Sequence, residues 1–570
     1  MSATAPPTIG HPAPGPRPAA WDRLVARWRR GPGPSWLLPA LAVLLGVGWA
    51  SSQLGSFQYA VDDAFITFSF SENLAAGDGP LFAADQRVEG YSNFLWVVLV
   101  ALPLTVAPEL SPLLVARWLC LPFALLLSAA LWTLVRRLSG SRVAALAALF
   151  LLGGTSSLAL ACLSGLETYA FTALVTAGVG LHLLSRQDSR WAVVAPWLLL
   201  AAALTRFDGL LPYLVLGGWE AGRAWRGDRS ARRTFLKRWG PPLVVFAAWF
   251  AWRWSYYGLP LPSTVYAKSL IPRLLPTRGL QYVLQELAGS GLLFALVPAG
   301  LLLAWRRPET RPLLLFLVID LAYVAAAGGD WMPFGRFVLP VVPLALAVVV
   351  LGAAELVAAG RRASLPLAVR VAGWGLLAAG LLGLWLQLDH RWVNDRDEQR
   401  KLAAARREQA HVESLQQAAA WLDEVIPPGG RLVTDYAGVF AVDTDAYVID
   451  TWGLCTPEVA LRGDTRGINP IYGKTCPACL ARLAPEYFHV QQPLIRQATA
   501  FRSPVEVVAA VFQYRRISQY IDLKKDFIVG RVRQPATDRA AYFLERRRPG
   551  RQYQPHRLSS GRLLEYPFSR

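Results

Sequence analysis

The sequence predicts a polytopic α-helical membrane protein with a C-terminal α/β domain outside the membrane. Three observations predict this fold class. Of the 570 residues, 54% are hydrophobic and only 17% are charged, and a mean hydropathy of +0.32 is too apolar for a string of soluble domains. Long apolar stretches recur through the first 387 residues. From about residue 388 the pattern changes to an amphipathic helix followed by short apolar runs between turn residues.

The apolar stretches predict about eleven transmembrane helices. Windows of roughly 17–25 apolar residues are long enough to cross a bilayer. The stretch 191–219 carries a polar interruption, Thr205–Asp208, and is expected to form two short crossings that meet at one face. The run 93–107 is expected to lie at the membrane interface, because counting it as a span would invert the charge pattern of every later loop. The remaining nine windows are 35–53, 113–135, 142–157, 168–184, 240–256, 287–305, 312–327, 337–357 and 366–387.

The basic residues predict the orientation. The formal net charge is +19, which by itself is also typical of nucleic-acid-binding proteins. Six segments on the side of the N-terminus hold 22 Lys/Arg and 5 Asp/Glu. Because basic short loops stay in the cytoplasm, we expect the N-terminus inside, everything after residue 387 outside, and no nucleic-acid partner. The six segments are 1–34, 136–142, 185–190, 220–239, 305–311 and 360–364.

Four regions are expected along the chain. Residues 1–34 are rich in Pro and Ala and are expected to be a disordered cytoplasmic segment. Residues 35–387 are expected to form the transmembrane domain, whose first outer loop spans 54–112. An extracytoplasmic α/β domain over 388–530 follows. Residues 531–570 are expected to be a basic tail, either solvated or in contact with anionic lipid headgroups.

Within the outer domain, a long helix is expected over 395–425, ending at the Pro-Pro-Gly-Gly turn. Short apolar runs predict strands at Arg431–Thr434, Val439–Val442 and Tyr447–Asp450. Helical stretches are expected near 505–520.

Cys476 and Cys479 are separated by Pro-Ala in this outer domain. A local disulfide is favoured there in an oxidising compartment. Half of a zinc site is the weaker alternative, because no second Cys/His pair has suitable spacing.

Charged residues gather at the expected outer ends of the spans. Ionisable groups in or beside a membrane are costly and usually mark a functional or a paired structural site. Five separate hairpins would bring these charged groups to one external surface. The charged residues are Asp62, Asp63, Glu167, Arg206, Asp208, Arg253, Lys268, Asp330 and Arg336.

This set of groups suits transfer from a lipid phosphate to an external acceptor. The adjacent carboxylates Asp62 and Asp63 can act as a general base for a hydroxyl or hold a divalent cation. The cationic side chains can neutralise a phosphate that leaves with developing charge. The aromatic residues Tyr91, Tyr257 and Trp331 suit a sugar ring.

Structural roles for the same residues remain open from the sequence alone. The carboxylate pair can cap a helix that begins at Ala64. Arg206 and Asp208 can form a purely structural ion pair, and Glu167 can cap the following span. Asp320, inside a span, is expected to be a satisfied interhelical polar group.

Several segments resemble the GT-C superfamily of polyprenyl-phosphate-sugar glycosyltransferases. The likeness is greatest to the bacterial branch that contains the mycobacterial terminal β-(1→2)-arabinofuranosyltransferase. It spans roughly residues 35–500, and the first outer loop and the Gly-Gly-Asp-Trp-Met loop are its most specific parts. The similar segments are Val61–Thr67, Val88–Trp96, Ser164–Thr168, Leu204–Arg206, Tyr256–Gly258, Tyr266–Lys268, Gly328–Pro340 and Tyr447–Leu454.

The resemblance implies a polyprenyl-phosphate-linked sugar donor, an envelope glycan or glycolipid acceptor, an inverting reaction and a bacterial plasma-membrane location. By position, Asp62 or Asp63 would deprotonate the acceptor hydroxyl, with Asp62 slightly favoured. Residues expected to hold the donor phosphate are Lys268, Arg336 and Arg206. Residues expected to bind substrate are Glu89, Tyr91, Asn93, Glu167, Asp208, Tyr257, Asp330 and Trp331.

The chain departs from the family pattern at two places. It has Arg206–Gly209 as Arg-Phe-Asp-Gly where relatives often have Arg-Pro-Glu-Gly, and Pro262–Thr264 as Pro-Ser-Thr where they often have Pro-Asn-Thr. These differences concern the sugar and the acceptor more than the reaction class.

Two other functions compete with a glycosyltransferase. A lipid-linked-sugar transporter predicts inverted repeats and polar sites at the membrane midplane, whereas these charges gather at one face. A non-enzymatic envelope scaffold gives no reason for Asp62, Asp63 and Arg336 to lie together at the membrane.

Overall fold

The computed structural model describes residues 59–567, apart from 84–85, 269–274, 331, 333–334, 364–365, 389–395, 464–475, 491–494, 497–500, 512–518 and 538. The expected N-terminal segment 1–34, the first span 35–53 and Trp331 lie outside the described residues.

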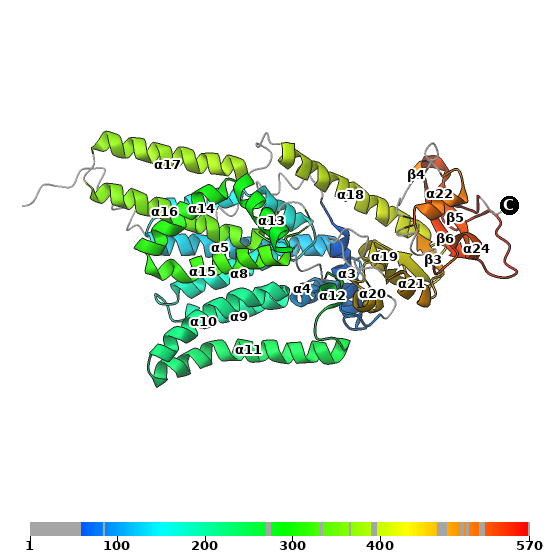
Figure 1. Ribbon diagram of the computed structural model, residues 1–570, viewed down its shortest axis with the longest axis horizontal. Helices are drawn as coiled ribbons and strands as arrows, with labels where there is room; N and C mark the ends of the chain where they lie inside the picture. Colours follow the sequence, from blue (N-terminus) through cyan, green and yellow to red (C-terminus); the bar gives the residue numbers. More distant parts are fainter. Residues whose placement is uncertain are drawn as a thin grey trace, which may run out of the picture.

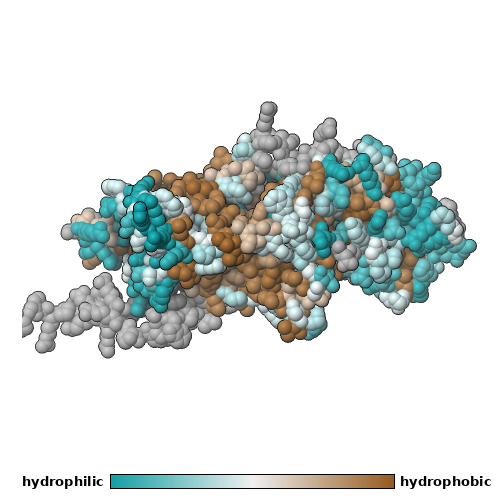
Figure 2. All heavy atoms as spheres, turned by 90° about the horizontal axis from the view of Figure 1, so that it is seen from below, coloured by the Kyte–Doolittle hydropathy of each residue, from teal (hydrophilic) through white to brown (hydrophobic). Residues whose placement is uncertain are grey.

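A bundle of helices and a mixed α/β domain follow one another along the long axis of the molecule (Figure 1). The bundle carries a broad apolar belt between two hydrophilic ends (Figure 2), as expected for a membrane domain. By length and composition, four described helices can cross a membrane, or six if each of two bent pairs counts as one span. The protein is thus a multi-pass membrane protein, although the eleven spans are not confirmed as a number.

The short helices α3 (Asp62–Ala76) and α4 (Phe94–Val106) lie in the segment 54–112. This segment and the domain after residue 388 keep the names first outer loop and outer domain from their expected positions. The helices of the bundle are α5 (Pro112–Ser139), α6 (Arg142–Gly153), α7 (Ser156–Leu163), α8 (Thr168–Leu184), α9 (Trp191–Thr205), α10 (Leu210–Arg226), α11 (Arg229–Tyr257), α13 (Leu275–Gly289), α14 (Leu292–Arg306), α15 (Arg311–Ala327), α16 (Val342–Arg362) and α17 (Leu367–Leu388).

The predicted break at Thr205–Asp208 is present. Helix α9 ends at Thr205, a 3-10 turn η1 (Phe207–Gly209) follows, and α10 starts at Leu210. The C-cap residue Arg206 is extended, with φ −155° and ψ 142°, so the backbone reverses there. This geometry places the polar residues of the interruption at one end of both helices.

Two predicted spans are bent and one predicted loop is largely helical. The window 287–305 is divided between α13 and α14, which meet at 91°. Gly291 at the break has φ +70°, a conformation that side-chain-bearing residues rarely adopt. The window 142–157 is likewise divided between α6 and α7, at 57°. In the expected loop 220–239, only Gly227 and Asp228 separate α10 from α11, and Asp228 caps α11 by accepting a hydrogen bond from the Ala231 amide at 2.8 Å.

The outer domain begins with α18 (Arg396–Leu422) and contains one eight-stranded sheet in the order β2-β1-β3-β6-β5-β8-β7, with β4 paired to β6. Strand β1 runs parallel to β2 and β3, while β6 is antiparallel to β3 and β5. The strands are β1 (Arg431–Thr434), β2 (Tyr447–Asp450), β3 (Tyr487–His489), β4 (Ile495–Arg496), β5 (Phe527–Gln534), β6 (Arg539–Arg546), β7 (His556–Arg557) and β8 (Leu563–Glu565). The short helices are α19 (Ala437–Asp443), α20 (Pro457–Arg462), α21 (Pro477–Arg482), α22 (Pro504–Ala509) and α24 (Leu523–Asp526).

Two expectations for this domain are wrong. Val439–Val442 is predicted to be a strand but lies in α19, because a short apolar run does not distinguish a strand from a buried helical turn. Residues 531–570 are not a free tail. Strands β5 and β6 pair over their full length across the expected boundary, and the basic side chains lie on sheet residues such as Arg531, which pairs with Glu565 at 2.7 Å.

Candidate active site

A cavity of about 370 Å³ lies where the first outer loop, the outer ends of the bundle helices and the outer domain meet. Its walls come from α3, the segment before α4, the start of α8, η1, the short helix α12 (Ser263–Ala267), the end of α15 and the loop before α16. Eight of the predicted site residues line it, which are Asp63, Tyr91, Asn93, Glu167, Arg206, Asp208, Lys268 and Arg336. Segments far apart in the sequence thus converge on one space, as the topology predicted.

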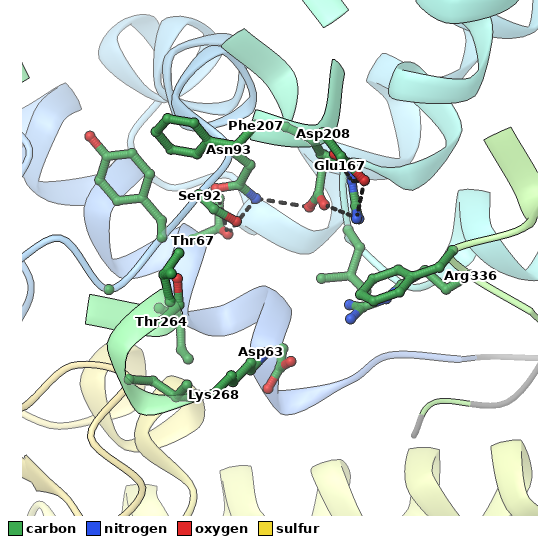
Figure 3. Close-up of a pocket in the computed structure, with 18 of the residues that line it drawn as sticks. Asp63, Thr67, Ser92, Asn93, Glu167, Phe207, Asp208, Thr264, Lys268 and Arg336 are labelled. Carbon is green, nitrogen blue, oxygen red and sulfur yellow. Dashed lines mark hydrogen bonds and ion pairs between the residues drawn. The ribbon is translucent and has the colours of Figure 1, made fainter. Parts of the chain in front are cut away.

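The two adjacent aspartates point to different places. Asp63 lines the cavity, and its carboxylate has no hydrogen-bond partner among the described residues. Figure 3 shows it beside Lys268 on one side of the pocket. Asp63 therefore has the exposure to the cavity that a general base requires.

Asp62 faces the outer domain instead. Its Oδ1 accepts a hydrogen bond from the Val439 amide at 2.8 Å, and its Oδ2 accepts one from the Gly438 amide at 3.3 Å. Burial raises the pKa of Asp62 to about 8, and the two hydrogen bonds oppose that rise. Asp62 does not line the cavity, so the sequence-based preference for Asp62 as the base is not supported by the geometry. Asp62 does act as a cap, but on α19 rather than on α3, which begins at Asp62 itself and not at the expected Ala64.

One guanidinium between two carboxylates forms the opposite wall. Arg206 donates from Nε to Asp208 Oδ1 at 3.0 Å and from Nη1 to Glu167 Oε1 at 3.1 Å. Asn93 Nδ2 extends this network by donating to Glu167 Oε2 at 2.9 Å and to Thr67 Oγ1 at 3.0 Å. The network gives the wall a row of fixed acceptors and donors with a net charge of −1 (Figure 3).

Lys268 and Arg336 are the other two cationic residues of the cavity. Arg336 is held by Asp330, with Nε 2.6 Å from Oδ2, and its guanidinium lies over the Phe337 ring at 5.2 Å. Lys268 is exposed, and none of the described residues forms an ion pair or hydrogen bond with its ammonium group. Lys268 is therefore the cation most available to an anionic ligand.

Other predicted residues support the cavity from behind. Glu89 forms a buried ion pair with Arg253, with Arg253 Nε 2.8 Å from Oε1. The Tyr91 and Tyr257 hydroxyls lie 3.0 Å apart, and Tyr257 donates to the Pro80 carbonyl at 2.8 Å. Burial raises the pKa of Tyr91. These residues fix the first outer loop against the end of α11 and do not, apart from Tyr91, line the cavity.

Some residues of the site were missed in the sequence. Thr67, Phe207, Thr264 and Tyr323 line the cavity without belonging to the predicted set, although the first three lie within four residues of predicted ones. Leu454 also lines it and comes from the outer domain, where it ends the segment Tyr447–Leu454 that resembles the GT-C family. Glu408 on α18 lies close enough to Asp63 for charge repulsion to add to burial in raising its own pKa.

The predicted cysteine pair, Cys476 and Cys479, does not line this cavity. Cys476 and Cys479 form a disulfide at the start of α21 in the outer domain. Within the described part of the chain, no group of three or more His, Cys, Asp or Glu residues is arranged to hold a metal ion.

The helical bundle, the polar cavity at one of its ends and the α/β domain beyond it define a multi-pass membrane protein, and its fold is shared by solved structures. Two solved structures are similar over almost their whole length. They are ArnT from Cupriavidus metallidurans bound to undecaprenyl phosphate, with TM-score 0.51, 13% identity and coverage of 90% of this chain and 98% of that one, and ArnT in the apo state, with TM-score 0.53, 15% identity and coverage of 89% and 97%. At this identity the likeness concerns the fold alone.

A named relative supports the resemblance found in the sequence. The chain is 26% identical over 380 residues to the terminal beta-(1->2)-arabinofuranosyltransferase of Corynebacterium glutamicum. The match covers 58% of this chain and 53% of that protein, so the chain spans about half the length of this curated relative. A family model described as Domain of unknown function (DUF8728) matches residues 401–542, which run from α18 into β6 across the wrongly expected boundary at 531.

Proposed function

We propose that the protein is a glycosyltransferase that moves a sugar from a polyprenyl phosphate to a hydroxyl of a cell-envelope glycan or glycolipid, with inversion at the anomeric carbon. One observation carries this proposal. A carboxylate with no partner among the described residues, Asp63, lines the same cavity as the available ammonium of Lys268 and the guanidinium of Arg336. A base and phosphate-binding cations in one space are what this transfer requires.

Each residue has a defined part in the proposed reaction. Asp63 accepts the proton of the acceptor hydroxyl as the oxygen forms a bond to the anomeric carbon. The bond between that carbon and the phosphate oxygen breaks, and the phosphate leaves with the electron pair. Lys268 and Arg336 neutralise the charge that develops on it. Arg206, which the resemblance assigns to the donor phosphate, is already paired with Asp208 and Glu167, so we assign its network of fixed donors and acceptors to sugar hydroxyls instead.

The relatives support the substrate class. One of the two similar ArnT structures is bound to undecaprenyl phosphate, a lipid phosphate of the proposed kind. The name of the Corynebacterium relative supports arabinofuranose as the sugar. No feature of the described cavity favours a transporter, because its polar residues lie at one end of the bundle rather than at its middle.

Lys268→Gln tests the assignment of the phosphate site. Loss of a charge-assisted contact of roughly 1.5–3 kcal/mol is expected to weaken undecaprenyl phosphate binding about 10- to 100-fold. Binding to the purified protein in detergent is measured by titration, and transfer from radiolabelled polyprenyl-phosphate sugars is followed in parallel. The matched control is Lys237→Gln, because Lys237 lies in the first half of α11, away from the end at Tyr257 that packs near the cavity. Equal affinity in both variants would remove Lys268 from the phosphate site, and an unmodified protein that transfers no sugar would refute the function.

We also propose a bacterial plasma-membrane location, with the N-terminus in the cytoplasm and the outer domain outside. The basic hairpin between α10 and α11 supports it, since such loops stay inside. A reporter that functions only in the cytoplasm is expected to be active when it is fused after Gly227. A reporter that functions only outside the membrane is expected to be active when it is fused at the C-terminus. The reverse pattern would place the cavity on the cytoplasmic face.

A further inference from the structure

The outer domain and the first outer loop share one hydrophobic core. Val61 and Phe65 of the loop lie in the same buried cluster as Phe440 and Val448 of the outer domain. Gln86 Nε2 donates to the Val448 carbonyl at 3.1 Å. Figure 1 places α19 and α20 against α3 and α12. The outer domain is therefore packed onto the loop that carries Asp63.

Glycines allow this packing at two points. A Cβ atom on Gly438 would clash with the Asp62 carbonyl oxygen and lie 2.9 Å from the Ile66 amide nitrogen. A Cβ atom on Gly90 would clash with the Cys455 sulfur. Real Cβ atoms do not approach other atoms so closely, so a larger residue at Gly438 would displace α19 from α3, and a larger residue at Gly90 would displace the segment around Cys455.

Asp62 connects the packing to the cavity. Its carboxylate accepts hydrogen bonds from the first turn of α19, and the next residue in the chain is Asp63. Both belong to the first turn of α3, where successive side chains point about 100° apart. When α19 holds Asp62, the direction of the Asp63 side chain into the cavity is fixed as well.

We propose that α19 acts as a clamp that orients Asp63 through Asp62, so that the contact between α19 and α3 is required for transfer to the acceptor but not for binding of the lipid phosphate. Asp62 is then a positioning residue. The phosphate-binding residues lie on other elements, since Lys268 follows α12, which packs against α20, and Arg336 belongs to the loop before α16. Leu454, which forms part of the cavity wall, gives the outer domain a second contact with the same space. This inference rests on the proposed function.

The test uses Asp62→Ala, Asp62→Asn and Gly438→Ala in the full-length protein. Hydrogen exchange of the Gly438 and Val439 amides reports docking, titration with undecaprenyl phosphate reports donor-site binding, and turnover with a radiolabelled polyprenyl-phosphate sugar reports transfer. Asp62→Ala and Gly438→Ala are expected to lose amide protection and about 10- to 100-fold in kcat, with the Kd for undecaprenyl phosphate changed less than about twofold.

Asp62→Asn separates positioning from base chemistry. Its amide oxygen still accepts the Val439 hydrogen bond, whereas the longer bond from the Gly438 amide to Oδ2 is lost. The variant is therefore expected to keep protection of the Val439 amide and kcat within about threefold, with an unchanged pH profile. Gly222→Ala is the control for a glycine substitution, because a Cβ atom added to Gly222 in α10 would meet no side chain and no other segment within 4 Å. Full kcat in Asp62→Ala or Gly438→Ala would overturn the clamp, as would an inactive Asp62→Asn.

Failure of the clamp and failure of the proposed function are distinguishable. If the unmodified protein transfers no sugar, the function is refuted. In that case the contact between Asp62 and α19 can still be tested. It is established if the Val439 amide is protected from exchange in the unmodified protein and not in Asp62→Ala, and it is refuted if the amide exchanges equally in the two proteins.

Discussion

Asp63→Asn is expected to lower the rate of sugar transfer about 10²- to 10⁴-fold, the usual contribution of a general base. The amide cannot accept the acceptor proton, while its size leaves the cavity unchanged. Because Asp63 has no hydrogen-bond partner among the described residues, little stability should be lost. Turnover of a radiolabelled polyprenyl-phosphate sugar measures the rate, and undecaprenyl phosphate binding shows whether the donor site is intact.

The matched control is Asp78→Asn, an exposed acid of the same outer loop. It is expected to retain the rate of the unmodified protein. If Asp63→Asn also retains it, Asp63 is not the base. If Asp63→Asn loses undecaprenyl phosphate binding along with turnover, Asp63 acts in binding instead.

Arg253→Met is expected to destabilise the protein by about 3–5 kcal/mol, because it leaves the buried Glu89 carboxylate without its partner. The two side chains are 1% and 3% exposed, so water cannot replace the lost contact. Arg253 also donates to the Pro260 carbonyl at 2.7 Å, which becomes unsatisfied. The measurement is thermal unfolding of the purified protein in detergent.

Two further variants make this test specific. Arg253→Met combined with Glu89→Leu removes both charges and is expected to recover much of the loss. Arg190→Gln disrupts an exposed ion pair with Asp188 and is expected to leave the Tm unchanged. A single variant as stable as the unmodified protein would show that the buried pair contributes nothing to the fold.

The convergence of the site was predictable from the sequence. Hydropathy and the charge of the loops predict where the spans end and on which side. Glu167, Arg206, Lys268 and Arg336 follow or precede span ends of the same side, and all four line the cavity. The break at Thr205–Asp208 was predictable for the same reason, since a polar cluster inside an apolar stretch must lie at a face.

The assignment of the two aspartates was not predictable. Adjacent identical residues carry no local signal that separates them, and the atom that decides between them belongs to Val439, 377 positions away. The contribution of Leu454 to the wall and the position of Glu408 depend on the same long-range packing. Likewise, the excess of basic over acidic residues in 531–570 predicts a tail, whereas the pairing of β5 with β6 decides the structure of its first part.

The contact between Gly90 and Cys455 has an evolutionary consequence. The two residues face each other across the junction of the loop and the outer domain, and neither position has room for additional atoms. A larger side chain at one position is acceptable only with a smaller one at the other, so the two positions are expected to vary together among related sequences. The absence of a side chain at Gly90 is thus required by a thiol 365 residues further along the chain.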